Sequence, residues 1–170
     1  MKRLLFYILR VMAFLSRCVS RKMYGHLIMM AHKIQGVHFV GVPEYIDFSA
    51  HLNASGGLSI GKGVVISTHA VILSHDWSFL IGVKANFSKP RENFLEFAYK
   101  EVEVCEHSFI GAGAIVLPGS KIGKYCIIGA GAVVKGKIED YSIVVGNPSK
   151  CIKNTSDWGK QFAISQVDFK

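Results

Sequence analysis

Large apolar residues recur at every sixth position along the middle of this chain. They stand at Ile60, Ile66 and Ile72, and after an interruption the count resumes at Val104, Ile110, Val116, Ile122, Ile128 and Val134. A small side chain follows four residues later in most units, as at Ala70, Ser108, Ala114, Ser120, Cys126 and Ala132. This pattern predicts a solenoid, because a β-sandwich of short strands would alternate at a period of two residues.

The solenoid is expected to be a triangular coil. Each six-residue unit supplies one short parallel strand and a turn, and three units close one rung of eighteen residues. Each buried Ile or Val contributes roughly 1.5–3 kcal/mol, which is enough to hold a narrow core together. Glycines follow directly at Gly61, Gly111, Gly123 and Gly129, where little room or unusual dihedral angles are expected. We expect a mainly β, parallel β-helix over residues 46–147, with the first rung near Ile46 and Leu52.

Residues 1–45 form a region of different composition before the solenoid. Residues 1–24 predict one uninterrupted basic amphipathic helix, in which Arg3, Arg10 and Arg17 recur every seven residues and Arg21 follows. The charges leave no apolar run near twenty residues, so the helix is not a membrane span, and no signal-peptide cleavage site follows. This helix either lies on an anionic membrane surface or packs against the solenoid end or a neighbouring subunit.

A second helical stretch predicts a cap for the solenoid. It runs through Leu27, Met30 and Ile34 and ends at Gly36. A cap is expected because the open end of a parallel coil exposes unpaired backbone groups.

Residues 76–103 interrupt the six-residue count as an inserted loop. The loop is rich in aromatic and basic side chains: Trp77, Phe79, Lys84, Phe87, Lys89, Arg91, Phe94, Phe97 and Tyr99. Loops of this length in compact folds are usually functional. The repeat decays after Val134 and ends near Pro148, which cannot continue a strand ladder. Residues 148–170 are expected to be a C-terminal tail, whose polar part from Asn154 onward docks elsewhere or frays.

Composition indicates one domain with an anionic partner. Half of the 170 residues are hydrophobic and the net charge is +8, which favours a nucleotide cofactor, an acidic glycan or a membrane surface. No nucleic-acid partner is expected, because the lysines are scattered and no recognition motif appears. The four cysteines show no metal or disulfide spacing and indicate free thiols in a reducing compartment: Cys18, Cys105, Cys126 and Cys151.

Two segments and one histidine are candidates for chemistry. Residues 110–115 (IGAGAI) and 128–133 (IGAGAV) are eighteen apart, so they stack into a strip without side chains. Such a strip either admits a long thin ligand to the backbone or simply suits tight corners. His75 closes the last unit before the loop and is either a general base or a surface histidine. A zinc site would need the side chains of His69, His75 and His107 to converge. The positions of His69 and His75 in the six-residue repeat instead place them on different faces of the coil.

Several segments resemble the hexapeptide-repeat acyltransferases, in the branch of maltose, galactoside, nodulation, capsule and streptogramin acetyltransferases. They are GGLSIGKGVVIS at 56–67, ILSHD at 72–76, SFIGAGAIVLPGSKIGKYCIIGAGAVV at 108–134 and YSIVVGNPSKCIK at 141–153. The resemblance implies a left-handed parallel β-helix, although parallel crossovers are normally right-handed. It also implies a homotrimer with acetyl-CoA in the groove between subunits. No metal is expected, because His69 and His75 point from different faces.

The resemblance also implies roles for individual residues. His75 matches the base that deprotonates the acceptor, Asn53 matches an asparagine that contacts the acceptor or acetyl group, and Asp76 either orients the site or begins the loop. The cofactor positions are Phe109 beside the thioester arm, Ala112 and Ala130 at the pantetheine arm, and three lysines for the CoA phosphates, Lys135, Lys150 and Lys153.

Two departures from the small-sugar enzymes refine the expected function. Residues 1–24 replace the familiar helical domain, and Asp76 replaces the usual proline after the histidine. We therefore expect an acetyl-CoA-dependent O-acetyltransferase that acts on a sugar hydroxyl of a surface glycan or its precursor, on the cytoplasmic side of a membrane. The alternatives are N-acetylation of an amino-sugar nucleotide and a non-catalytic trimeric scaffold tethered to the membrane.

Overall fold

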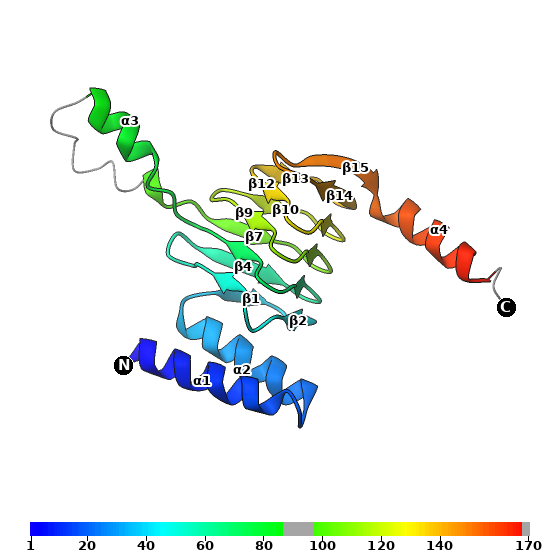
Figure 1. The fold of residues 1–170 in the computed structure, drawn as a ribbon, viewed down its shortest axis with the longest axis horizontal. Coiled ribbons are helices and arrows are strands. Elements are labelled where there is room, and N and C mark those ends of the chain that lie inside the picture. The colour runs from blue at the N-terminus through cyan, green and yellow to red at the C-terminus, as the bar shows by residue number, and fades with distance from the viewer. Residues whose placement is uncertain (87–96, 168–170) are drawn as a thin grey trace.

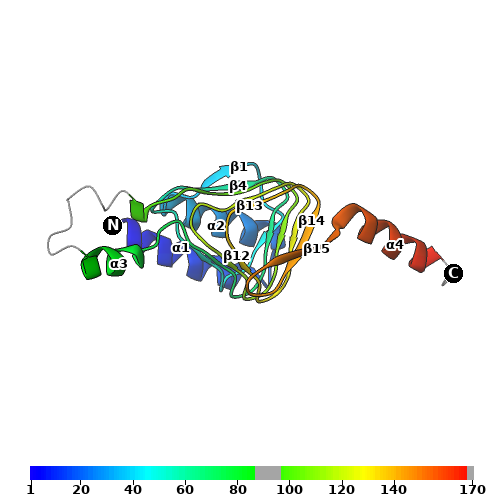
Figure 2. The ribbon, with the colours of Figure 1, turned by 90° about the horizontal axis from the view of Figure 1, so that it is seen from above.

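The six-residue positions line the interior of a three-sided coil. A computed structural model describes residues 1–86 and 97–167. All nine large apolar positions are at most 1% exposed, and so are the six small positions that follow them. The predicted solenoid is confirmed, and Figure 2 shows its rungs superimposed along the axis.

Three sheets form the sides of the coil, and their strands pair in parallel except for β15, which is antiparallel to β14. Sheet A contains β1 (His38–Val40), β4 (Leu58–Gly61), β7 (Val102–Val104), β10 (Lys121–Ile122) and β13 (Lys137–Ile138). Sheet B contains β2 (Tyr45–Ile46), β5 (Val65–Ile66), β8 (Phe109–Ile110), β11 (Ile127–Ile128), β14 (Ser142–Val145) and β15 (Lys150–Asn154). Sheet C contains β3 (His51–Leu52), β6 (Val71–Ile72), β9 (Ile115–Val116) and β12 (Val133–Val134).

The strand register explains where the regular count holds and where it changes. In the later rungs Ile128 pairs with Ile110 and Val134 with Val116, eighteen residues apart. The first rung is longer, because Ile66 pairs with Ile46. The solenoid also begins earlier than the large apolar residues predict, since β1 already pairs with β4 through Phe39 and Ile60.

The outer faces of the three sheets differ in chemistry. Sheet A presents polar and charged side chains, with an ion pair of 2.7 Å between Lys121 Nζ and Glu103 Oε2. Sheets B and C instead present apolar side chains, most of them half-buried: Tyr45, Val65, Phe109 and Ile127 on sheet B, and Val71, Ile115 and Val133 on sheet C. These two faces are therefore poorly suited to permanent contact with water.

Two helices cover the first rung (Figure 1). They are α1 (Lys2–Ser16) and α2 (Arg21–Ile34), with Ser20 capping α2 by accepting a hydrogen bond from the Met23 N–H. The prediction of one uninterrupted helix through residue 24 is wrong, because the chain reverses at 17–20 and α1 packs back on α2. The predicted cap is confirmed: the buried Tyr24 hydroxyl donates to the Ile46 carbonyl at 2.7 Å.

The insertion and the tail project from opposite sides of the coil (Figure 1). The insertion contains α3 (Phe79–Asn86), and its residues Phe87, Lys89, Arg91 and Phe94 lie outside the described residues. The expectation that strand pairing ends at Pro148 is wrong, because β15 turns back and pairs antiparallel with β14. After β15 the chain continues as α4 (Thr155–Val167).

Candidate functional site

A group of polar side chains lies at the corner between sheets C and A, where the insertion leaves the coil. Asn53 follows β3, and Ser74 and His75 follow β6 one rung above. The Asn53 side-chain oxygen, Oδ1, lies 3.0 Å from His75 Nδ1 and accepts a hydrogen bond from the Ser74 hydroxyl at 2.9 Å. The Ser55 hydroxyl also donates to this oxygen at 2.8 Å and lies 3.1 Å from His75 Nδ1. We call residues 53–56 and 73–76 the histidine corner.

The Asn53 oxygen determines which nitrogen of His75 carries the proton. An amide oxygen only accepts hydrogen bonds, so His75 Nδ1 meets it as an N–H donor. In the neutral imidazole the other nitrogen, Nε2, then has a free lone pair. The histidine corner therefore holds His75 in the tautomer that a general base requires.

Aromatic residues of the insertion surround His75. The His75 ring centroid lies 6.3 Å from that of Tyr99 and 6.5 Å from that of Trp77, and these two aromatic rings meet edge to face at 5.7 Å. His75 and Tyr99 also form an isolated antiparallel bridge. The predicted position of His75 at the base of the inserted loop is thus what the structure shows.

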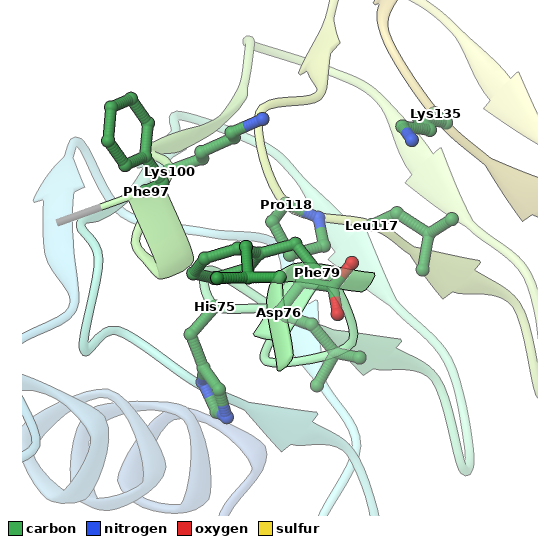
Figure 3. A pocket seen from close by; sticks show the side chains of 10 residues that line it. His75, Asp76, Phe79, Phe97, Lys100, Leu117, Pro118 and Lys135 are labelled. Atoms are coloured by element: carbon green, nitrogen blue, oxygen red, sulfur yellow. The ribbon is translucent and has the colours of Figure 1, made fainter. Parts of the chain in front are cut away.

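Asp76 has a different role from His75. Its carboxylate accepts a hydrogen bond of 2.8 Å from the Ser78 N–H, and hydrogen bonding to Ser78 holds the pKa of this carboxyl below its usual range. Figure 3 shows the Asp76 carboxylate and the His75 ring pointing apart. Asp76 therefore organises the start of the loop, and Asn53 is the residue that orients the imidazole.

Two cavities border the histidine corner. The larger, about 500 Å³, is lined by His75 and Asp76 and by residues of the coil and insertion: Leu73, Phe79, Val83, Phe97, Lys100, Leu117, Pro118 and Lys135. The smaller, about 330 Å³, includes Asn53 and Ser55 in its wall and is otherwise lined by Lys2, Arg3, Ile34, Gln35, His51, Leu52 and Ala54. The hydrogen-bonded group thus has one cavity on the side of the insertion and another on the side of the helical cap.

The lysines predicted to hold phosphates do not lie together in one chain. Lys135 lines the larger cavity together with Lys100, and in Figure 3 both lie on the side away from the His75 ring. Neither lysine forms an ion pair within residues 1–86 and 97–167. Lys150 and Lys153 lie on β15, at the edge of sheet B. A single chain therefore offers two separate basic positions.

The two IGAGA segments form the corner between sheets B and C, which we call the glycine corner (residues 111–113 and 129–131). The segments stack as predicted, because the Gly111 N–H donates to the Ile128 carbonyl at 2.8 Å and the Gly131 N–H to the Ala112 carbonyl at 2.9 Å. Ala112 is half-buried and Ala130 is exposed at this corner. Phe109 precedes it on the outer face of sheet B and is 38% exposed.

Folding alone explains the glycines of this corner. Gly113 and Gly131 have φ of +64° and +66°, a conformation that other residues rarely adopt. A Cβ on Gly111 would lie 2.6 Å from the Ala130 nitrogen of the next rung. All four glycine N–H groups of the segments donate within the coil, so the glycine N–H groups are not free for a ligand.

The other histidines and Cys105 are poorly placed to bind a metal or to act as a nucleophile. His69, His75 and His107 lie at three different corners of the coil, so they do not converge as a zinc site would require. Within the described part of the chain, no three His, Cys, Asp or Glu side chains are grouped to hold a metal. Burial, together with the neighbouring Glu103 carboxylate, raises the pKa of the Cys105 thiol to about 11, which opposes a nucleophilic role.

A family model for the bacterial transferase hexapeptide (six repeats) matches residues 101–136. These residues span β7 to β12, where the register of eighteen is regular. Residues 101–136 thus carry the hexapeptide repeat of these transferases, and the resemblance to the hexapeptide-repeat acetyltransferases is confirmed.

Curated relatives match this hexapeptide-repeat chain over much of its length. A putative acetyltransferase of Schizosaccharomyces pombe is 42% identical over 119 residues, which are 69% of this chain and 52% of the relative. A putative lipopolysaccharide biosynthesis O-acetyl transferase of Escherichia coli is 25% identical over 120 residues, 70% of this chain and 61% of the relative. The chain thus spans only about half to three fifths of these two relatives.

Among solved structures, a galactoside acetyltransferase in complex with coenzyme A matches with a TM-score of 0.59. The identity is 19%, and the match covers 94% of this chain and 83% of that one. This likeness concerns the fold, and it confirms the left-handed parallel β-helix that the resemblance implied.

Sequence reasoning missed three residues of the site. Ser55 and Ser74 complete the hydrogen bonds around Asn53, and Lys100 lines the larger cavity. Ser74 could have been predicted from the sequence, because it is a polar residue directly before His75 within the repeat. In the structure it is fully buried. Lys100 could not have been predicted, because its position depends on where the inserted loop returns to the coil.

Proposed function

We propose that this chain transfers an acetyl group from acetyl-CoA to a hydroxyl of a sugar in a surface glycan or its precursor. One observation carries the proposal: a histidine held in the tautomer of a base by Asn53 stands at a corner with a cavity on each side. A transfer between two bound molecules needs such an arrangement, because donor and acceptor must reach the same base from different directions.

The larger cavity suits the donor. Its wall is mainly apolar, with two lysine ammonium groups at Lys100 and Lys135, and this combination fits a molecule with an apolar arm and several phosphates. Acetyl-CoA would supply an acetyl group activated as a thioester. Phe109, Ala112, Ala130, Lys150 and Lys153 lie away from this cavity, so we propose that a neighbouring copy contributes them.

His75 acts directly on the acceptor in this proposal. Its Nε2 takes the proton of the sugar hydroxyl as the oxygen attacks the thioester carbonyl carbon, and the carbon–sulfur bond breaks. The imidazolium then returns the proton to the departing thiolate. Asn53 stabilises the imidazolium through the Nδ1–H contact, and such base assistance is worth roughly 10²–10⁴-fold in rate.

The outer faces of sheets B and C support assembly as a homotrimer. Both faces are apolar, and they meet at the glycine corner, whose small residues permit close approach. If sheet B of one copy packs on sheet C of the next, a cyclic trimer closes and brings β15 of one chain toward the histidine corner of another. Ile115→Glu/Val133→Glu on sheet C should then yield monomers in sedimentation velocity, whereas Glu103→Gln on sheet A should leave the trimer intact.

We place this enzyme on the cytoplasmic side of a membrane, where activated sugars and acetyl-CoA are available. No helix in the described part of the chain is both long and apolar enough to cross a bilayer. Surface-glycan precursors are anionic or lipid-linked, which agrees with the net charge of +8.

A thiol-release assay tests the proposal. The full chain is incubated with acetyl-CoA and a panel of glycans and sugar nucleotides, each offered as matched alcohol and amine. Release that needs an alcohol acceptor supports O-acetylation, and release only with amines would assign N-acetylation instead. A scaffold would release no thiol with any acceptor and would show no thermal stabilisation by CoA.

A further inference from the structure

Helix α1 has two apolar faces, and only one of them is used in the fold. Phe6, Leu9 and Ala13 are buried against α2. Six large side chains on another side are 45–67% exposed: Leu4, Leu5, Ile8, Val11, Met12 and Leu15. At 100° per residue these six fall in one arc of about 120° that contains no charged residue. We call them the outer face of α1.

The arginines of α1 lie beside this face and not on it. The Arg10 guanidinium donates to the Phe48 carbonyl and stacks over the Phe48 ring at 4.5 Å and the Phe6 ring at 5.3 Å. Arg17 stacks on the Tyr24 ring at 5.6 Å. The basic stripe therefore helps to fix α1 to the rest of the protein, and it leaves the apolar outer face turned to the surroundings.

The cap that carries the outer face is strongly cationic. Residues 1–43 contain no Asp or Glu, and they hold seven basic residues: Lys2, Arg3, Arg10, Arg17, Arg21, Lys22 and Lys33. All of these except Arg10 are exposed. The cap thus accounts for nearly all of the net charge of +8 of the chain. An exposed apolar helix face bordered by cations matches a surface that is apolar inside and anionic outside.

We propose that the outer face of α1 lies in the interface of an anionic phospholipid membrane, with the helix axis parallel to the bilayer. The helix is about 22 Å long, so it rests in the headgroup region and does not span it. Exposed cations at either end of the hairpin, such as Lys2, Arg3 and Lys22, would contact lipid phosphates. The inference does not depend on acetyl transfer, because it uses only the cap.

The arrangement also explains why the exposed face is at the end of the coil. In a cyclic assembly whose coils pack side by side, all copies present the same end in one direction. Several α1 helices would then meet one membrane together, and weak single contacts would add to stable binding.

Sedimentation with vesicles tests the proposal on the full chain. We expect binding to vesicles that contain phosphatidylglycerol, little binding to phosphatidylcholine alone, and weaker binding as salt increases. Leu4→Gln/Leu15→Gln removes two side chains that are 65% and 67% exposed, and it should weaken binding about tenfold or more. Ile152→Gln/Ile164→Gln is the matched control, because these residues are 55% and 63% exposed at the other end of the protein; it should change nothing.

A charge variant and a reporter complete the experiment. Lys2→Gln/Arg3→Gln should weaken binding to anionic vesicles by roughly fivefold for each charge removed. Leu15→Trp keeps the face apolar and should show a blue shift of its added tryptophan emission when anionic vesicles are present. This reporter gives an answer even if the glutamine variant loses its fold.

Three outcomes would overturn the proposal. They are an absence of both vesicle binding and emission shift, equal loss of binding in the Ile152→Gln/Ile164→Gln control, and a wild-type oligomer that Leu4→Gln/Leu15→Gln dissociates without lipid. The last would show that a second copy of the chain covers the outer face.

Discussion

The two corners that flank sheet C make the same turn with different chemistry. The glycine corner follows the repeat without interruption, and its glycines are accounted for by positive φ angles and by close approach between rungs. The six-residue repeat ends at His75. There the half-buried Asn53 bonds to the buried Ser74 and to His75, and the Ser74 hydroxyl also accepts a hydrogen bond of 2.9 Å from the Gly56 N–H. The repeat does not account for Asn53 and His75, which makes them candidates for function.

In a solenoid, therefore, residues that repeat are explained by the coil, and the exceptions are candidates for chemistry. The following predictions test whether the two corners differ in this way.

Gly56→Ala should disrupt the histidine corner. A Cβ at this position would lie 2.1 Å from the Ser74 carbonyl oxygen and 2.8 Å from the Lys100 nitrogen, so the corner must shift. Overpacking of this kind costs about 1–3 kcal/mol or more. Thermal unfolding should show the loss, and CoA-dependent stabilisation should fall with it. Unchanged stability would mean that the insertion does not pack closely on this corner.

The acid sensitivity of the fold between pH 6.5 and 4 should arise in the cap, at His32. Burial lowers the pKa of His32 from 6.5 to about 4, and neither of its ring nitrogens has a hydrogen-bond partner among the described residues. The unfolded chain takes up this proton more readily, so stability is full above pH 6.5 and decreases toward pH 4, by about 3 kcal/mol. Denaturant unfolding of His32→Leu across this range should lack most of the decrease; an unaltered pH dependence would refute this origin.

Asn53→Ala should lower turnover by about one to two orders of magnitude. Without the Oδ1 acceptor, His75 loses the contact that selects its tautomer, and hydrogen bonds to charged groups contribute about 1.5–3 kcal/mol. The expected signature is a lower kcat with little change in KM for acetyl-CoA. Ser49→Ala is the matched control, since Ser49 bonds to Thr68 and His69 between β2 and β3, and it should leave kcat unchanged.

Gly113→Ala should lower only the free energy of unfolding, by about 1 kcal/mol. Its φ of +64° strains any other residue, but a Cβ there would meet no atom of residues 1–86 and 97–167 within 4 Å. Denaturant unfolding should show this small loss while the monomer keeps its fold. A loss much larger than that of Gly56→Ala would reverse the comparison between the corners.

The coil could be predicted from the sequence because its determinants are local and periodic. Ile66 and Ile110 pair in neighbouring strands although the insertion separates them in the sequence. Their positions in the six-residue repeat are enough to predict that both are core residues. His75 was predictable because it stands where that phase ends. The reversal of the chain at 17–20 was not predictable from periodicity, since arginine spacing continues through the turn. Lys100 and Ser55 depend on contacts between rungs and across the insertion, which sequence spacing does not encode.

The role of His75 as the base can be tested by comparing the turnover of His75→Ala with that of His69→Ala. Both histidines stand at corners of sheet C, and only His75 bonds to Asn53. We predict that His75→Ala lowers kcat by about 10²–10⁴-fold with CoA binding and the oligomer retained, while His69→Ala turns over normally. Near-normal turnover by His75→Ala, or equal loss in both variants, would contradict the account.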